Sequence, residues 1–262
     1  MKTIDTIYTV GCSFTKMIAR LPGKDLVPYH SQWPAVLGQK FNATAVNEGL
    51  WGSSNQRSFR RLKSFLERNK NDLDKILILV QMTFPARFEM PNDNQKVEDY
   101  ANPDDCPEQL KENWIRLNPG WMDASAMSGN TEFQWFVENS HSVLGSVCLP
   151  RVKEYKTEFE EGLQKVYGKT IRYTKEAENL DEITYLYAFK GLLNSYKANG
   201  YILFGDKRIL EIKQLRESVP EILDCGCIRA MAGEYVSLDN YHPDFEGSKV
   251  VADKLYEALK YR

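Results

Sequence analysis

Two short apolar runs constrain the fold of this chain more than any other feature. The segments 76–80 and 201–204 are apolar at every position and show no alternation with polar residues. A strand with one face in water alternates between apolar and polar residues, whereas a strand covered on both faces does not. The two runs therefore predict a buried parallel sheet with helices on both sides.

Strand-like and helix-like segments alternate along the chain, as in proteins built from βαβ units. The expected strands, about five in all, are 4–10, 43–47, 75–81, 201–204 and 227–230. Helical periodicity predicts helices over 31–41, 55–68, 152–167, 180–197, 207–217 and 247–259. The basic residues of the second helix are expected to form a solvated face: Arg57, Arg60, Arg61 and Lys63. This order predicts a three-layer α/β/α, flavodoxin-like fold with its site at the carboxyl ends of the strands.

We expect one domain, 1–262, with a long insertion after the third strand at about 85–150. A chain of 262 residues can bury a core of this kind without disulfides or metals. The insertion is polar, yet it contains Trp114, Trp121 and Trp135. Because long structureless loops are unusual in compact domains, we expect it to have structure of its own and to form a wall of the substrate pocket. The alternative is that these tryptophans only anchor the insertion to the domain body.

Composition excludes several classes of partner. The formal net charge is -2, with both signs mixed along the chain, which argues against binding to nucleic acid or to an anionic membrane. The N-terminus shows no signal peptide and the chain no membrane span, so we expect a cytoplasmic protein. The five cysteines include no CxxC pair, and Cys225-Gly226-Cys227 lacks a second pair for a metal. Without phosphate-binding glycine motifs, no cofactor or metal is expected.

Three residues near the two ends of the chain are suited to nucleophilic catalysis. Ser13 follows the first predicted strand on a tight turn, and Asp239 precedes His242 by three positions. A serine needs a base to become a nucleophile, and the base needs a third group to hold its tautomer. Cys12 is a rival nucleophile, but neighbouring residues on a turn point in different directions. The other two histidines, His30 and His141, have no accompanying motif.

A glycine-rich segment follows the second predicted strand. In Asn47-Glu48-Gly49-Leu50-Trp51-Gly52, a glycine N–H is able to approach a substrate oxygen closely, as an oxyanion hole requires. The alternative is an ordinary turn between a strand and a helix.

These segments resemble the conserved blocks of the SGNH, or GDSL, hydrolases. The first block, G-D-S-x-S, is similar to Gly11-Cys12-Ser13-Phe14-Thr15, with Cys12 and Thr15 as departures. The second block is similar to Asn47 with Gly52, and the last, D-x-x-H-P, matches 239–243, followed by Gly247 and Ala252. The segment Ser31-Gln32-Trp33-Pro34 resembles a helix start found in many members.

The third block departs from the family pattern. Members carry G-x-N-D after the third strand, where the Asn side chain is the third oxyanion donor, but this chain reads Gln81-Met82-Thr83-Phe84-Pro85. The string resembles a divergent branch of bacterial and phage SGNH-like proteins. Thr83, Asn55 and Arg87 are candidates for the missing donor, whose loss lowers the rate by about 10²-fold to 10³-fold.

The resemblance implies a serine esterase that needs no cofactor. It implies Ser13 as nucleophile, His242 as base, Asp239 as its orienting group, and the N–H groups of Ser13 and Gly52 as oxyanion donors. The substrate is then a small-molecule or carbohydrate ester, such as an O-acetyl group, since sugars pack on tryptophan. Two alternatives stay open: an acyltransferase on the same scaffold, and a catalytically weak binding or structural module of a phage particle or surface-polysaccharide system.

Overall fold

A computed structural model describes residues 3–16, 31–50, 53–83, 88–91, 114–117, 175–205, 218–223, 225–236 and 242–262. The chain divides into two compact units, one formed by 1–84 with 180–262 and the other by 85–179. In the second unit, β4 (Phe88–Pro91) pairs antiparallel with β5 (Trp114–Leu117). The first unit contains the main sheet and the candidate site.

The main sheet is parallel and has the predicted flavodoxin-like order. Its strands are β1 (Thr6–Val10), β2 (Thr44–Asn47), β3 (Ile76–Met82) and β6 (Asn199–Phe204), in the order β2-β1-β3-β6. Thr9 lies opposite Asn47, and Val10 lies opposite Val80, so the carboxyl ends of the strands meet at one edge. The predicted fold class is confirmed, and in such sheets this edge is where ligands bind.

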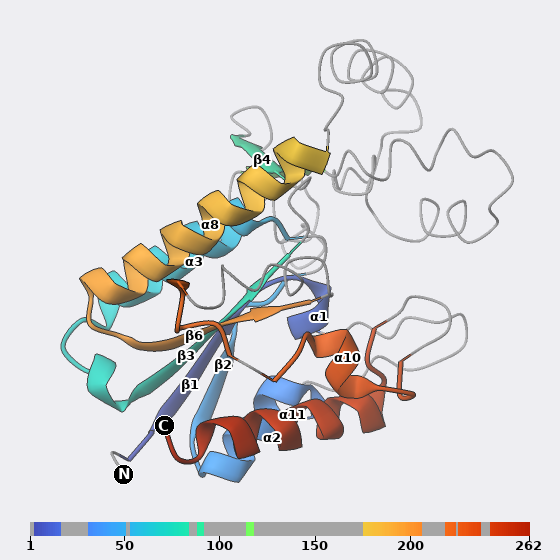
Figure 1. Cartoon of the computed structure of the whole chain (residues 1–262). Coiled ribbons are helices and arrows are strands. Elements are labelled where there is room, and N and C mark those ends of the chain that lie inside the picture. Colours follow the sequence, from blue (N-terminus) through green and yellow to red (C-terminus); the bar gives the residue numbers. More distant parts are fainter. Residues whose placement is uncertain are drawn as a thin grey trace, which may run out of the picture. The chain divides into compact units, whose positions relative to one another are not determined.

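Helices cover both faces of the sheet, as Figure 1 shows. One face carries α3 (Asn55–Arg68) and α8 (Lys175–Ser195), and the other carries α2 (Trp33–Phe41), α10 (Ile228–Ala232) and α11 (Phe245–Leu259).

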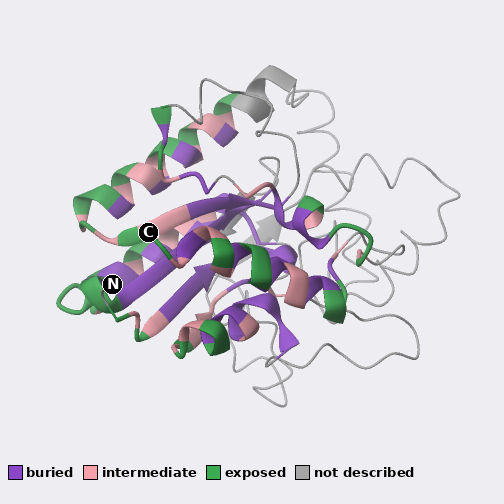
Figure 2. Ribbon diagram, turned by 60° about the horizontal axis from the view of Figure 1, so that its bottom comes forward, coloured by how far each residue is buried: buried purple, intermediate pink, exposed green. Residues whose placement is uncertain are grey.

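Successive strand residues point to opposite layers, which explains the absence of alternation in the sequence. Ile78 and Val80 pack in the cluster with α3 and α8, whereas Leu77 and Leu79 pack in the cluster with α2 and α11. Figure 2 shows the resulting core as buried strands between helices that are exposed only on their outer sides.

One predicted strand was wrong and the others were shifted only at their ends. The segment 227–230 is not a strand, because Ile228–Ala232 forms α10, and the Cys227 side chain caps this helix by accepting a hydrogen bond from Ala230 N at 3.4 Å. A single parallel bridge, Ile202 with Ile222, extends the sheet beside β6 instead. The helix predicted over 55–68 has those bounds. The helices predicted over 152–167 and 207–217 lie outside the described residues.

Within the described ranges, no helix is both long enough and apolar enough to cross a bilayer. The same ranges contain no group of three or more His, Cys, Asp or Glu residues that could hold a metal ion.

Candidate active site

The structure brings Ser13 and His242 into contact from opposite ends of the chain. Ser13 begins α1 (Ser13–Lys16) three residues after the last position of β1, and its side chain is almost fully buried. Ser13 Oγ lies 2.6 Å from His242 Nε2, although the two residues are 229 positions apart. The His242 ring stacks on Phe14, with ring centroids 4.5 Å apart and planes at 27°. The sequence predicted this pairing, which gives the serine a base within hydrogen-bond reach.

Cys12, the rival nucleophile, points away from His242. Its side chain is completely buried, and Sγ donates a hydrogen bond to Gln81 Oε1 at 3.2 Å. The hydroxyl of Ser13 is therefore the side chain of this turn that meets the imidazole.

The segment that follows His242 is anchored to the residues 235–236. Just after His242, Pro243 forms an antiparallel bridge with Val236, and Asp244 N donates to Tyr235 O at 2.9 Å. Asp244 then caps α11 by accepting from Gly247 N at 2.8 Å. A β-carbon at Gly247 would lie 2.4 Å from Tyr235 O, so only glycine fits this approach. These contacts fix the backbone next to the imidazole.

The loop after β2 is hydrogen-bonded to the turn that carries Ser13 (residues 11–15, the serine turn). Asn47 Nδ2 donates to Thr15 O at 3.1 Å, while Asn47 Oδ1 accepts from Gly49 N at 2.9 Å. Leu50 N donates to Gly11 O at 3.0 Å. Asn47 thus joins the loop to α1, and the loop leads on to Gly52, which lies outside the described residues, as does Asp239.

Trp33 supports the same turn from α2. Its indole Nε1 donates to Phe14 O at 2.8 Å, and its ring is completely buried against the sheet. Because Phe14 also stacks on His242, Trp33 supports the residue on which the imidazole rests.

A charged cluster lies beside this loop and corrects one prediction. Glu48 accepts from Tyr8 OH at 2.7 Å and from Arg61 Nε at 2.9 Å, while Arg57 donates to the Glu48 backbone oxygen at 2.9 Å. Arg57 is buried, so the face of α3 that was expected to be solvated is in part buried and hydrogen-bonded to this loop. Burial, with the adjacent Glu48 carboxylate, raises the pKa of Tyr8 above its usual value.

The candidates for a third oxyanion donor have different surroundings. Asn55 is buried, and its side chain forms a reciprocal pair with the Thr83 backbone: Asn55 Nδ2 donates to Thr83 O at 3.1 Å, and Thr83 N donates to Asn55 Oδ1 at 2.8 Å. Asn55 therefore joins the start of α3 to the end of β3. Arg87 lies outside the described residues, as do Trp121, Trp135 and the side chain of Trp114.

Sequence reasoning missed Gln81, the buried polar residue near the end of β3. Its side-chain oxygen accepts from Cys12 N at 2.9 Å and from Thr15 Oγ1 at 3.1 Å, so it contacts the turn on both sides of Ser13. The available signal was a lone amide in the otherwise apolar run Ile76–Met82. A buried amide needs hydrogen-bond partners, and the serine turn supplies them.

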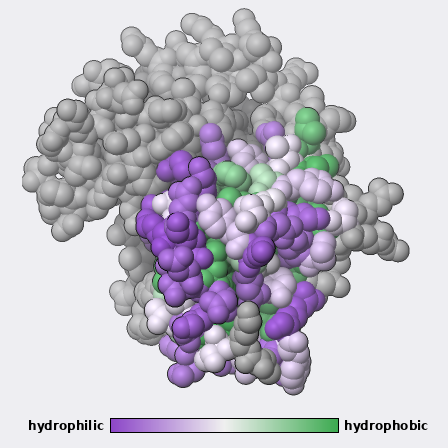
Figure 3. All heavy atoms as spheres, turned by 90° about the vertical axis from the view of Figure 1, so that its left-hand side faces the viewer, coloured by the Kyte–Doolittle hydropathy of each residue, from purple (hydrophilic) through white to green (hydrophobic). Residues whose placement is uncertain are grey.

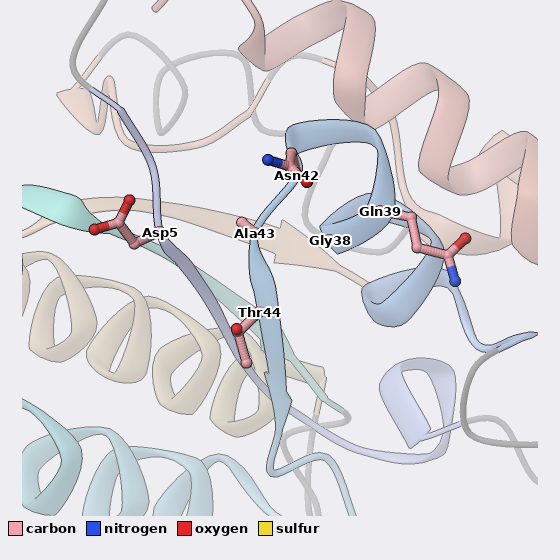
Figure 4. Close-up of a pocket in the computed structure, with 6 residues that line it drawn as sticks. All are labelled: Asp5, Gly38, Gln39, Asn42, Ala43 and Thr44. Carbon is pink, nitrogen blue, oxygen red and sulfur yellow. The ribbon is translucent and has the colours of Figure 1, made fainter.

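An open pocket lies at the opposite edge of the sheet. Figure 4 shows its lining at the amino ends of β1 and β2: Asp5, Gly38, Gln39, Asn42, Ala43 and Thr44. Its volume is about 460 Å³. None of these lining residues is a nucleophile with a base beside it, so a catalytic site is expected at the carboxyl edge of the sheet.

The serine turn also offers a backbone donor. Among the residues that the structure describes, none accepts a hydrogen bond from Ser13 N. This N–H belongs to the same residue as the Oγ that contacts His242. A serine hydroxyl, an imidazole beside it and a backbone N–H on the same turn are three of the groups that acyl transfer requires.

Comparison with known proteins gives structural likeness only. No family model and no curated protein matches this chain. The psychrotrophic esterase EstA from Pseudoalteromonas sp. is 12% identical, with 98% of this chain and 97% of that chain covered and a TM-score of 0.47. A lipolytic G-D-S-L family member from Veillonella parvula is 13% identical, with 98% and 99% covered and a TM-score of 0.46. A carbohydrate acetylesterase family member from Sinorhizobium meliloti is 12% identical, with 98% of this chain and 98% of that chain covered and a TM-score of 0.36.

Proposed function

We propose that this protein is a serine ester hydrolase in which Ser13 is the nucleophile. The observation that carries the proposal is the 2.6 Å contact between Ser13 Oγ and His242 Nε2 at the carboxyl edge of the sheet. A serine capping a short helix needs no imidazole, and a structural histidine needs no serine from the other end of the chain. The resemblance of both segments to SGNH blocks supports the same assignment.

In the acylation step, the lone pair on His242 Nε2 takes the Ser13 proton while Oγ bonds to the ester carbonyl carbon. The carbonyl electron pair moves to oxygen, and the N–H groups of Ser13 and Gly52 stabilise the oxyanion. The tetrahedral intermediate then expels the alcohol, which takes the proton from His242. Asp239 is proposed to hold the other ring nitrogen and to stabilise the imidazolium.

In the deacylation step, water replaces the alcohol. His242 takes a proton from the water as its oxygen attacks the acyl carbon, and Ser13 leaves with that proton. The bond from the acyl group to Ser13 Oγ breaks, and a carboxylic acid is released. No redox change occurs, and each proton taken by His242 is returned within the same half-reaction.

We propose an O-acyl ester of a carbohydrate as the substrate. The support is the sequence of the insertion, which places Trp114, Trp121 and Trp135 in a polar segment directly after β3. Aromatic rings pack against the apolar faces of sugars.

The proposal is tested by the hydrolysis of p-nitrophenyl acetate. Ser13→Ala is expected to lower kcat by about 10⁴-fold or more and to leave the fold unchanged by circular dichroism. Cys12→Ala is the matched control, because the two residues are adjacent and only Ser13 contacts the base. Similar losses in both variants, or a full rate in Ser13→Ala, would contradict the assignment.

A further inference from the structure

The Gln81 side chain is an amide enclosed in an apolar strand. Every residue of β3 is buried, and Gln81 has no exposed surface. An amide buried without hydrogen bonds destabilises a fold, because it loses its bonds to water and gains none in the protein. All the partners that the structure gives the Gln81 oxygen lie in the serine turn.

Gln81 Oε1 accepts hydrogen bonds from both sides of the nucleophile. The residue before Ser13 donates twice, Cys12 N at 2.9 Å and Cys12 Sγ at 3.2 Å, and Thr15 Oγ1 donates at 3.1 Å. A backbone N–H only donates, so the atom that faces Cys12 N must be the oxygen of the amide. One oxygen thus holds the turn on either side of Ser13.

The orientation of this amide is fixed by its surroundings. Gln81 Nε2 donates to Met82 O, and a β-carbon at Gly205 would lie 2.9 Å from Nε2. On the other side, a β-carbon at Gly11 would lie 2.6 Å from Oε1. The absence of a side chain at these two glycines therefore leaves room for both ends of the amide.

We propose that Gln81 is the positioning residue of the nucleophile. This role rests on the proposed function, since Gln81 would act by keeping Ser13 Oγ aimed at His242 Nε2. Gln81 has no exposed surface and its side-chain oxygen accepts hydrogen bonds from the serine turn, so its proposed role differs from that of an oxyanion donor. A displacement of about 1 Å in a reacting group lowers the rate by about 10²-fold. Loss of the Gln81 oxygen is therefore expected to lower kcat and to leave KM nearly unchanged.

The test compares variants by their rate of labelling with a fluorophosphonate and by kcat and KM for p-nitrophenyl acetate. Gln81→Leu removes the acceptor at similar volume, and Gln81→Glu keeps an oxygen facing the turn. Gln81→Leu is expected to lose about 10-fold to 10²-fold in labelling rate and in kcat. Gln81→Glu is expected to recover part of that loss, and KM is expected to stay within about threefold in both.

Leu77→Ala is the control for stability. Leu77 is buried near the start of β3, away from the turn, and its truncation destabilises the fold by leaving a cavity in the core. It is expected to keep the wild-type labelling rate when assayed well below its Tm. If Leu77→Ala loses as much as Gln81→Leu at equal Tm, or if Gln81→Glu is no faster than Gln81→Leu, the positioning role is overturned.

If Gln81→Leu does not fold, a pair of less disruptive variants at Thr15 tests the same proposal. Thr15→Val removes one hydroxyl donor at nearly constant volume, and Thr15→Ser keeps it. Thr15→Val is expected to slow labelling by about threefold to tenfold, and Thr15→Ser is expected to keep the wild-type rate. Equal rates for the two variants would overturn the proposal. A wild-type protein that is not labelled overturns the proposed function itself, whereas a labelled wild type with an equally fast Gln81→Leu overturns only this inference.

Discussion

The two edges of the main sheet differ in whether their polar side chains are buried. At the carboxyl edge, the described residues include a set of buried polar side chains, among them Ser13, Thr15, Gln32, Ser53, Asn55, Gln81 and Thr83. At the amino edge, β2 and β6 begin with the exposed residues Thr44 and Asn199, and the pocket beside β1 and β2 is open. Figure 3 views the amino edge, where the coloured surface is mainly hydrophilic.

This difference indicates that the carboxyl edge is a built site and that the amino edge is ordinary surface. Polar groups at the amino edge lie in water and need no partner, whereas each one buried at the carboxyl edge destabilises the fold unless it is hydrogen-bonded. The hydrogen bonds there make three connections between separate segments of the chain: the serine turn to β3 through Gln81, the loop after β2 to α1 through Asn47, and α3 to the end of β3 through Asn55. Changes at the carboxyl edge should therefore alter catalysis, and changes at the amino edge should not.

Among the variants that contrast the two edges, the largest effect is expected for a change at His242. Replacing it in His242→Gln removes the base and is expected to lower kcat by about 10³-fold to 10⁴-fold. Asp5→Asn, in the pocket at the amino edge, is expected to keep the wild-type kcat. Both are measured on a short-chain ester. A strong loss in Asp5→Asn with retained activity in His242→Gln would reverse the assignment of the two edges.

The second comparison concerns one ion pair at each edge. Glu48 is mostly buried and is held by Arg61 at 2.6 Å, whereas Asp253 is largely exposed beside Lys40. Glu48→Gln is expected to lower the free energy of unfolding by about 2 kcal/mol, because Arg61, which is itself partly buried, loses its charged partner. Asp253→Asn is expected to lower it by about 0.2–1 kcal/mol. Urea denaturation measures both, and equal losses would remove the contrast.

The third comparison uses two glycines in helices. A β-carbon at Gly247 would lie 2.4 Å from Tyr235 O, and one at Gly38 would lie 2.9 Å from Ala43 O. Alanine at either position is expected to destabilise the fold by about 1–3 kcal/mol, less the gain in helix propensity of about 1 kcal/mol. Only Gly247→Ala should also lower kcat, because it displaces the backbone next to His242. An unchanged kcat in Gly247→Ala would mean that this approach does not position the imidazole.

The smallest effect is a pH dependence at Tyr8. Its pKa is raised in the folded protein, so the unfolded chain releases this proton near pH 10 while the folded chain retains it. The stability that results is present below pH 10 and is lost as the pH rises, by about 1.4 kcal/mol per pH unit. Tyr8→Phe is expected to give a shallower decline between about pH 10 and pH 11.5, measured by denaturation. The same slope in both proteins would contradict the buried contact with Glu48.

The layers of the fold were predictable because they depend on local patterns. The run 76–80 has no alternation, and the stripe of Leu62, Phe65 and Leu66 in 55–68 has helical spacing, so both elements were predictable from the sequence. The segment 227–230 was misread because Cys227-Ile228 looks strand-like, whereas a cysteine side chain caps the helix there. Capping of this kind depends on the geometry of one turn and not on periodicity.

The contact of Ser13 with His242 was predictable from motifs, but its support was not. Gln81 and Arg57 contact the turn and the loop through hydrogen bonds between segments that are distant in sequence. Which buried polar group finds which donor depends on how the helices pack, and no spacing in the sequence encodes it. The apolar run around Gln81 indicated that an amide would be buried there, but not that its oxygen would face the serine turn.

The most direct test of the central claim is the intact mass of the protein after treatment with a fluorophosphonate, followed by peptide mapping. An activated serine attacks the phosphorus and displaces fluoride, so the wild-type protein should gain one phosphonyl group on Ser13. Ser13→Ala should gain none, and His242→Gln should react far more slowly. An unmodified wild-type protein, or a label on a residue other than Ser13, would contradict the account.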